Sequence, residues 1–182
     1  MRDLVVFVGV TLILAYVSRG SLPRPGSHGF YRFFAWESML GLYVLDMPAW
    51  DADTHPVCQT IAGASFSIAL LLALGGFAQL LLSGAPDPGR NDAPMLPFEK
   101  TTTLVTTGIY RYIRHPIYSS LLFLCWGFFF KQPAAVNGVL AVTASALLIV
   151  TARVEENENI RYFGEAYRDY MKRTRMFLPF LL

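Results

Sequence analysis

The stretch VCQTIAGASFSIALLLALGGFAQLLL, from Val57 to Leu82, contains no charged residue. At 1.5 Å per residue, a helix of this length exceeds the roughly 30 Å of hydrocarbon in a bilayer. Small residues within it suit close approach of neighbouring helices, and these are Gly63, Ser67, Gly75 and Gly76. The stretch therefore predicts a transmembrane helix that packs against others.

The composition also indicates a membrane protein. The chain has 182 residues, of which 54% are hydrophobic and 15% charged, with a mean hydropathy of +0.41. Soluble domains carry about 25% charged residues. The net charge of +2 is too small to indicate nucleic-acid binding. Cys58 and Cys125 lie in apolar segments without the spacing of a disulfide framework or a metal site, so we expect buried thiols and no metal.

Two further apolar segments precede this stretch and two follow it: Leu4–Val17, Phe33–Trp50, Pro116–Phe130 and Ala134–Ala152. The first has no small-residue cleavage site after it and is expected to remain as a span. Lys131-Gln132-Pro133 separates the last two segments and predicts a tight antiparallel helical hairpin. The predicted fold class is therefore all-α, a polytopic membrane protein with about five transmembrane helices.

Two acidic residues, Glu37 and Asp46, interrupt the second apolar segment. Ionisable groups inside a membrane are costly unless they are paired, solvated or functional. Two interpretations stay open: both lie near the ends of the span and are solvated or paired, or they line a path for a substrate.

The lysines and arginines are distributed unequally between the two sides of this arrangement. Only Arg2 and Lys131 fall on the side that carries the N-terminus. All others fall on the opposite side: Arg19, Arg24, Arg32, Arg90, Lys100, Arg111, Arg114, Arg153, Arg161, Arg168, Lys172, Arg173 and Arg175. Because positive residues concentrate in cytoplasmic loops, we predict an external N-terminus and a cytosolic C-terminus.

Three polar segments then meet at the cytosolic side. The linker from Ser83 to Thr107 is rich in proline and glycine and predicts neither helix nor strand, although its β-branched end from Thr101 is suited to wrap a ligand. The motif TGIYRYIRHPIY, from Thr107 to Tyr118, places polar side chains directly before an apolar run. The tail from Glu155 to Arg173 has apolar residues at helical spacing and predicts an amphipathic helix.

Among the three histidines, His115 lies in this motif and is the candidate for chemistry, with a purely structural role at the start of the fourth helix as the alternative. His28 lies in an expected turn and His55 in a short outer loop. Neither has the spaced partners that a metal site requires, so we expect no metal.

The motif and the tail together resemble the integral-membrane methyltransferases, the isoprenylcysteine carboxyl methyltransferases and the related phospholipid methyltransferases. The resemblance rests on Gly108-x-Tyr110-x3-Arg114-His115-Pro116-x-Tyr118, followed by a hairpin and then Glu155-Glu156-x7-Gly164-x2-Tyr167-x2-Tyr170. It covers residues from Thr101 to the end of the chain. It implies a division into N-terminal transmembrane helices (1–83) and a cofactor-binding methyltransferase core (84–182).

The resemblance implies S-adenosylmethionine as the cofactor and a lipophilic or lipid-anchored small molecule as the substrate. The family's cofactor positions fall here on Thr102, Thr103, Leu104, Val105, Tyr110, His115, Pro116, Ile117, Tyr118 and Glu155. These types suit the cofactor, since tyrosine or histidine donors bind a carboxylate, Glu155 accepts from an ammonium or ribose, and aromatic faces favour a sulfonium. In-line methyl transfer depends on positioning and water exclusion.

The candidate catalytic residues are Arg153 and Glu156. In the isoprenylcysteine enzymes an arginine linked to the substrate carboxylate lies one helical turn before the first glutamate, but Thr151 occupies that position here and Arg153 lies on another face. This displacement argues against a prenylcysteine carboxylate. A phosphoethanolamine amine would instead need a base such as Glu156 or His115. Ser120 and Met95 also depart from the family pattern.

Two other classes of function remain as alternatives. An NADPH-dependent membrane reductase of the sterol type would need more basic residues than the linker offers. The other class is a non-catalytic membrane protein, such as a scaffold or a small transporter; inverted repeats with broken helices would favour transport, and we see none. The expected partners are a lipophilic substrate and membrane lipids, with no nucleic acid. The expected location is a multi-pass protein of the bacterial inner membrane or the endoplasmic reticulum, with its active site facing the cytosol.

Overall fold

The computed structural model describes residues 1–47, 50, 55–91 and 93–179. The described part is all-α, as predicted, and contains no β-strand. Its elements are α1 (Arg2–Val17), α2 (His28–Asp46), α3 (Pro56–Ser83), the 3-10 helices η2 (Pro97–Glu99) and η3 (Gly108–Arg111), α4 (Pro116–Lys131), α5 (Ala135–Phe163) and α6 (Glu165–Arg173).

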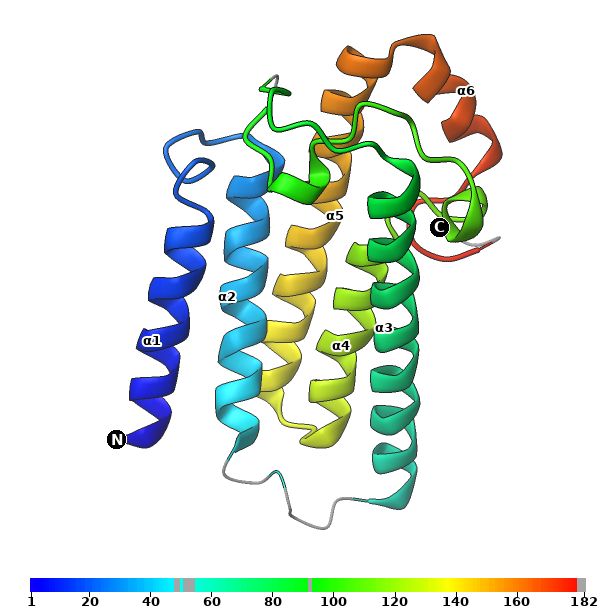
Figure 1. The fold of residues 1–182 in the computed structure, drawn as a ribbon. Coiled ribbons are helices and arrows are strands. Elements are labelled where there is room, and N and C mark those ends of the chain that lie inside the picture. Colours follow the sequence, from blue (N-terminus) through cyan, green and yellow to red (C-terminus); the bar gives the residue numbers. More distant parts are fainter. Residues whose placement is uncertain (48–49, 51–54, 92, 180–182) are drawn as a thin grey trace.

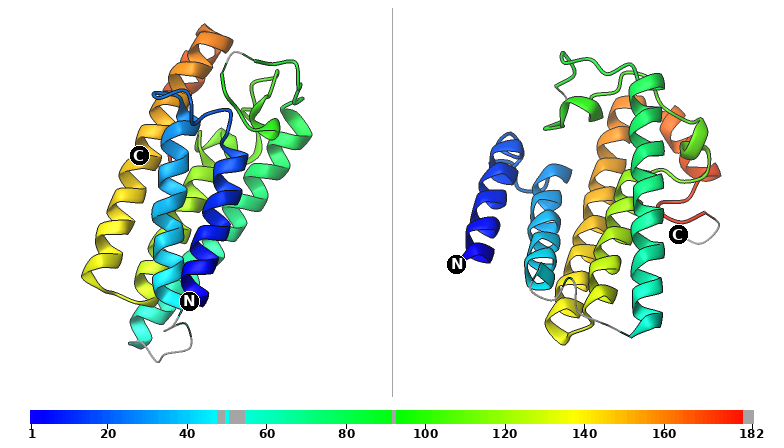
Figure 2. Two further views of the ribbon diagram at one scale, coloured as in Figure 1. Left: turned by 90° about the vertical axis from the view of Figure 1, so that its left-hand side faces the viewer. Right: turned by 60° about the horizontal axis from the view of Figure 1, so that its bottom comes forward.

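The five long helices form a bundle in the spatial order α1, α2, α5, α4, α3 (Figures 1 and 2). A short turn joins α4 to α5 at one end of the bundle, and the N-terminus lies at this end too. The linker between α3 and α4 and the short helix α6 lie at the opposite end. The chain thus gathers the linker, the motif and the tail at one place.

Local sequence explains where the helices begin and end. Ser27 caps α2 by accepting a hydrogen bond from the backbone N–H of Phe30. Pro56 and Pro116 open α3 and α4, where a missing N–H costs nothing. Gly164 ends α5 with a φ of 63°, a conformation that favours glycine.

The predicted start of the tail helix was wrong. A separate amphipathic helix was expected from Glu155 to Arg173, but α5 continues without interruption to Phe163 and only then turns at Gly164 into α6. Residues 153–163 carry charged side chains but no helix breaker, so propensity extends the buried helix into the polar region. Glu155 is therefore rigidly connected to the bundle. The linker also differs from the prediction, because it contains η2.

Helix α4 packs tightly against α3 through two glycines. A Cβ at Gly127 would lie 2.5 Å from the Phe66 ring, and one at Gly76 would lie 3.0 Å from Ile117 Cγ1. Gly63 and Gly75, also predicted to support close packing, have no such neighbour. The core itself lies where α2, α4 and α5 meet, and Leu42, Cys125 and Leu148 are buried there. Cys125 is buried as predicted, whereas Cys58, also expected to be buried, is only half-buried.

The outer faces of the bundle are apolar. Leu71, Leu74 and Leu82 on α3 are each at least 60% exposed, and α1 shows a similar row of exposed apolar side chains. A large exposed apolar surface indicates contact with a membrane or a partner. By length and composition, α3 and α5 can each cross a membrane, whereas α4 is shorter. These features support a membrane location.

Glu37 and Asp46, the acidic residues of α2, both have polar partners. Glu37 accepts a hydrogen bond of 2.8 Å from Thr11 Oγ1 on α1. Asp46 lies at the end of α2 and accepts from Asn137 Nδ2 at 3.0 Å. Both contacts are between helices, which agrees with the first of the two interpretations, namely paired groups.

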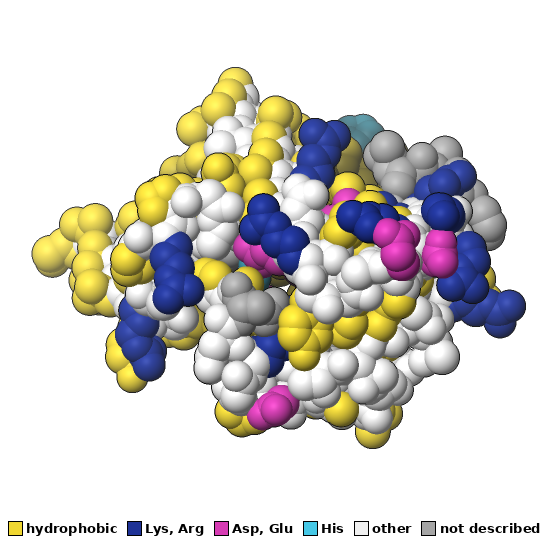
Figure 3. Space-filling view, turned by 90° about the horizontal axis from the view of Figure 1, so that it is seen from above, with side chains coloured by type: hydrophobic (Ala, Val, Ile, Leu, Met, Phe, Trp, Pro, Cys, Tyr) yellow, Lys and Arg dark blue, Asp and Glu magenta, His cyan; other side chains and the backbone are white. Residues whose placement is uncertain are grey.

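The end of the bundle that carries the linker and α6 is the polar one. Viewed toward this end, lysine, arginine and acidic side chains are scattered over the surface, while hydrophobic side chains gather at the outer edge (Figure 3). The site described next lies beneath this surface.

Candidate functional site

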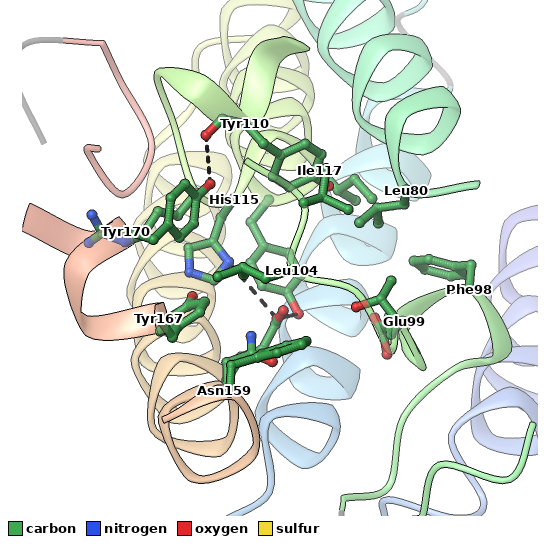
Figure 4. Close-up of a pocket in the computed structure, with 16 residues that line it drawn as sticks. Leu80, Phe98, Glu99, Leu104, Tyr110, His115, Ile117, Asn159, Tyr167 and Tyr170 are labelled. Carbon is green, nitrogen blue, oxygen red and sulfur yellow. Dashed lines mark hydrogen bonds and ion pairs between the residues drawn. The ribbon is translucent and has the colours of Figure 1, made fainter. Parts of the chain in front are cut away.

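A cavity opens where the linker, the start of α4, the end of α5 and α6 come together (Figure 4). Of the residues predicted to bind a cofactor, the following line it: Leu104, Val105, Tyr110, His115, Ile117, Tyr118 and Glu155. They come from three separate segments of the chain, so the fold brings together what the sequence keeps up to 51 residues apart.

Glu155 is the central carboxylate of this cavity. The Tyr118 hydroxyl donates to Glu155 Oε2 at 2.5 Å, and His115 Nδ1 lies 4.0 Å from the same oxygen. The His115 ring stacks on Tyr118 with centroids 5.4 Å apart and planes 16° apart. Pro116 fixes the first turn of α4, so both rings leave the helix start in a defined direction. Glu155 itself is partly exposed and can accept further hydrogen bonds.

Tyrosines form a second wall of the cavity. The Tyr170 hydroxyl on α6 donates to the backbone carbonyl of Tyr110 at 2.6 Å, which ties α6 to η3. Tyr167 packs edge-on against Tyr170 and points toward the same space (Figure 4). Burial, together with Glu155, raises the pKa of Tyr110 and Tyr167 above the ordinary value. These hydroxyls therefore stay neutral and can serve as donors.

Glu156 does not line the cavity. Its Oε1 accepts from Arg114 Nε at 2.6 Å and lies 3.4 Å from His115 Nε2. Arg114 Nη1 also donates to the carbonyl of Thr174 at 2.6 Å. Arg114 thus joins Glu156 on α5 to the segment after α6, and the predicted catalytic role of Glu156 stays a prediction.

Four other predicted residues also lie outside the cavity. Arg153 is exposed, so it does not replace the family's arginine within this space. Thr102 and Thr103 are exposed, and Thr102 Oγ1 donates to the carbonyl of Ala85 at 2.8 Å, which folds the linker onto the end of α3. Pro116 is buried as the first residue of α4.

Sequence reasoning missed most of the remaining lining residues. Arg114, Tyr167 and Tyr170 belong to the quoted motif and Thr101 begins the segment expected to wrap a ligand, whereas the following were missed: Leu80, Phe98, Glu99, Asn159 and Phe163. A signal existed for Asn159, which follows Glu155 by one helical turn and so lies on the same face. No local pattern marked Glu99, because the linker has no periodicity and its path is set by contacts with α2.

Glu99 belongs to a buried charge network that involves α2. It pairs with Arg32 Nη1, lies 3.4 Å from His28 Nε2 and accepts from the Leu96 N–H at 2.8 Å. His28 Nδ1 lies 2.5 Å from Glu158 Oε2 on α5. His28 was expected in a turn without a role, but it is buried in the first turn of α2 and links the linker to α5.

These contacts perturb the two titratable partners in opposite directions. Burial opposes the charged form of His28, but hydrogen bonds to Glu158 and Glu99 outweigh it and raise the pKa to about 10. Burial likewise opposes the charged form of Glu99, but Arg32 and His28 lower its pKa to about 2. Both groups are therefore ionised at neutral pH.

A second cavity of about 450 Å³ adjoins the first. It lies between α2, α3 and α4 and is mostly apolar, with Trp36, Phe66 and Leu124 among its lining residues. Both cavities are lined by Phe98, Glu99, Ile117 and Tyr118, so these four side chains separate the two spaces. Within the described ranges, no group of three His, Cys, Asp or Glu side chains is placed to hold a metal.

The sequence of this chain matches a known protein family. The phospholipid methyltransferase family matches residues 64–166, more than half of the chain. The chain belongs to the phospholipid methyltransferase family. The predicted family resemblance is thus confirmed, and the matched region runs from α3 into the start of α6, including the motif and Glu155.

Individual relatives of this family member have two kinds of name. A methanethiol S-methyltransferase 1 of Bradyrhizobium diazoefficiens is 31% identical over 86% of this chain and 55% of its own length. A methanethiol S-methyltransferase of Pseudomonas deceptionensis is 33% identical over 40% of this chain and 27% of its own length. A protein-S-isoprenylcysteine O-methyltransferase of Mus musculus is 37% identical over 44% of this chain and 29% of its own length. The chain thus spans about half or less of these relatives, and no solved structure gives a significant match.

Proposed function

We propose that this family member is an integral-membrane methyltransferase that uses S-adenosylmethionine and methylates a lipophilic or lipid-anchored small molecule. The observation that carries the proposal is the Glu155 carboxylate, bonded to Tyr118, beside His115 and facing Tyr167 across one cavity. The names of the relatives, which are O- and S-methyltransferases, support the same reaction class.

The residues of the first cavity fit the chemical groups of this cofactor. S-adenosylmethionine supplies an electrophilic methyl group on a sulfonium. Glu155 and Asn159 offer oxygen acceptors for an ammonium or ribose hydroxyls, and the neutral hydroxyls of tyrosines offer donors for a carboxylate. Aromatic rings from Phe98 and Tyr110 present faces that favour a sulfonium.

Cofactor entry requires the cavity to widen. The space measures about 80 Å³, which accommodates only a few water molecules. One wall is the linker and another is α6, and the Tyr170 hydrogen bond to the Tyr110 carbonyl joins α6 to η3. We expect these two walls to move outward on binding and to close afterwards, which excludes water during transfer.

The orientation in the membrane follows from the arrangement of helices and charge. We place five spans in the bilayer: α1, α2 from Phe33, α3, α4, and α5 as far as Ala152. The linker, the motif and α6 then lie at the cytosolic surface, because most lysines and arginines are at this end. His28, Glu99 and Glu155 lie at the boundary between headgroups and cytosol in this arrangement.

The protein's own task in this reaction is to position two reactants. An acceptor enters from the lipid side and the cofactor from the cytosol, so the four side chains shared by the two cavities lie where reacting atoms would meet. No covalent nucleophile is required for in-line methyl transfer.

Equilibrium binding to detergent-purified protein tests the proposal. Radiolabelled S-adenosylhomocysteine should bind, NADPH should not compete, and His115→Ala should weaken binding at least tenfold. The exposed His55→Asn variant serves as the matched control and should bind like wild type. Binding of NADPH in place of S-adenosylhomocysteine would overturn the proposal in favour of a reductase.

A further inference from the structure

Arg90 connects the linker to the end of α5. The residue is buried, and its guanidinium carbon lies 3.7 Å from the centroid of the Tyr162 ring and 5.2 Å from that of Phe163. Its Nη1 donates to the carbonyl of Thr101 at 2.5 Å. Arginine can use its flat face for a ring and its edge for hydrogen bonds at the same time. One side chain thus joins the second half of the linker to the last two residues of α5.

These contacts lie beside the first cavity. Thr101 and Phe163 line the cavity, whereas Arg90 and Tyr162 do not. Gly164 follows Phe163 and leads directly into α6, so Arg90 also lies at the base of the α6 wall. Arg90 can therefore position two walls of the cavity without touching a molecule inside it.

Another part of the linker is attached to the N-terminal half of the bundle. Glu99 pairs with Arg32 on α2. The Phe98 ring packs edge-on against Phe77 on α3, with centroids 4.8 Å apart. Loss of the contact at Arg90 would free the part of the linker that faces α5, while these attachments would remain as a hinge.

We propose that Arg90 is a positioning residue that holds the linker closed over the first cavity by stacking on Tyr162, and that release of this contact controls cofactor exchange. The inference rests on the proposed function for the identity of the ligand. The stacking itself is a property of the empty protein, so closure and exchange can be measured separately.

The first test measures closure without any cofactor. Val105 is buried and lines the cavity, so a Val105→Cys thiol reports opening by its rate of reaction with a charged, water-soluble maleimide. The parent protein also carries Cys58→Ser, and its remaining thiol, Cys125, is fully buried. Arg90→Gln removes the cation and Tyr162→Leu removes the ring, and each should raise the labelling rate about threefold to thirtyfold. Tyr162→Phe keeps the ring and should label like the parent.

Asn91→Ala is the matched control for Arg90→Gln. The Asn91 side chain is exposed and bonds within the linker, to the Gly89 carbonyl and Lys100 Nζ, so its loss should not change the labelling rate. The double variant Arg90→Gln/Tyr162→Leu should label no faster than the faster single variant, because both changes remove the same contact.

Parent-like labelling of Arg90→Gln, equal acceleration in Asn91→Ala, or additive acceleration in the double variant would overturn the inference. If Arg90→Gln does not fold, Tyr162→Leu decides, because that position is 41% exposed and tolerates substitution.

The second test measures exchange in the protein with its native cysteines. Radiolabelled S-adenosylhomocysteine should dissociate from Arg90→Gln faster than from wild type, by about the same factor as the labelling rate rises. A merely structural role would lower the unfolding temperature without changing either rate well below it, and unchanged dissociation would overturn control of exchange. Failure of the proposed function is distinguishable, because the wild type would then not bind S-adenosylhomocysteine while the labelling rate would still respond to Arg90→Gln.

Discussion

The two cavities differ in the origin of their walls. The first is built almost entirely from the linker and the C-terminal half, with tyrosines, a histidine and carboxylates. The second is built from α2, α3 and α4 with apolar side chains, and Arg32 is its one basic residue among those that line it. The family match begins at residue 64 and excludes α1 and α2. The comparison teaches that the region matched by the family model contributes most of the first cavity, whereas α2, outside that region, contributes the charged end of the second.

Neutralising Glu99 should destabilise the protein at both cavities, because this side chain lines each of them. Glu99→Gln leaves the charges of Arg32 and His28 without their carboxylate, and we expect a loss of about 3 kcal/mol of stability. Thermal unfolding in detergent measures it. Glu165→Gln, whose side chain is 75% exposed, is the control and should change little. An unaltered unfolding temperature in Glu99→Gln would mean that the two spaces do not depend on this network.

The stabilisation that His28 gives to Glu99, which lies between the two cavities, should decrease at alkaline pH. The folded pKa of His28 is raised to about 10 by Glu158 and Glu99, against 6.5 in the unfolded chain. Its stabilisation is thus complete below about pH 6.5 and is lost as the pH rises through 10, by about 3 to 4 kcal/mol between pH 7 and 10. The charged groups that face it are Glu99, Glu158, Arg32 and, further away, Glu155.

Unfolding temperatures of wild type and His28→Asn across this pH range isolate the contribution, because the other titrating groups are common to both proteins. The difference between the two should shrink as the pH approaches 10. A difference that is constant with pH would show that His28 is neutral in the folded protein.

Glu155→Gln should affect the first cavity alone. The change removes the charge that faces the proposed cofactor but keeps an acceptor for Tyr118, so we expect S-adenosylhomocysteine binding to weaken at least tenfold. Stability should change less than in Glu99→Gln, because Glu155 is partly exposed. Isothermal titration calorimetry measures the affinity, and undiminished binding would place the cofactor elsewhere.

Ala73→Leu should affect the second cavity alone. Ala73 lines it from α3, and the larger side chain fills space that the acceptor would occupy. Acceptor turnover should fall several-fold while S-adenosylhomocysteine binding is unchanged, since one or two methylenes of pocket space are worth about 1–3 kcal/mol. Ala78→Leu, on the exposed face of the same helix, is the control. Equal turnover in Ala73→Leu and Ala78→Leu would show that the acceptor does not bind in this cavity.

Arg153→Ala should have the smallest effect, below twofold in turnover, because the side chain is exposed and outside both cavities. Initial rates with saturating cofactor measure it. A loss of tenfold or more would restore Arg153 as the family's displaced arginine.

Much of the helical framework could be predicted, because uncharged runs such as Val57–Leu82 leave few alternatives to a helix in a membrane. Motif residues such as His115 and Glu155 could be named because their spacing resembles a family. The extension of α5 to Phe163 could not, since the charged residues after Ala152 looked like the start of a new segment.

The roles of His28, Arg32 and Glu99 were beyond the sequence for a different reason. Glu99 lies 67 residues after Arg32 in a linker without periodicity, and only the packing of that linker onto α2 brings them together. Arg32 was counted among the positive residues between the first two spans, and that count does not indicate burial. Glu156, considered as a base for an amine substrate, instead makes a contact with Arg114 that the sequence did not indicate.

The continuity of α5 fixes the distance between Glu155 and the opposite end of the bundle. Glu155 follows Ala135, the first residue of α5, by 20 residues, which corresponds to about 30 Å along an unbroken helix and thus to one hydrocarbon thickness. In the proposed orientation, the carboxylate would therefore stay at a constant distance from the opposite surface of the membrane. Acceptors would then be sorted by how far their reactive atom extends beyond the part buried in lipid, and membranes of different thickness would present the same molecule at different heights.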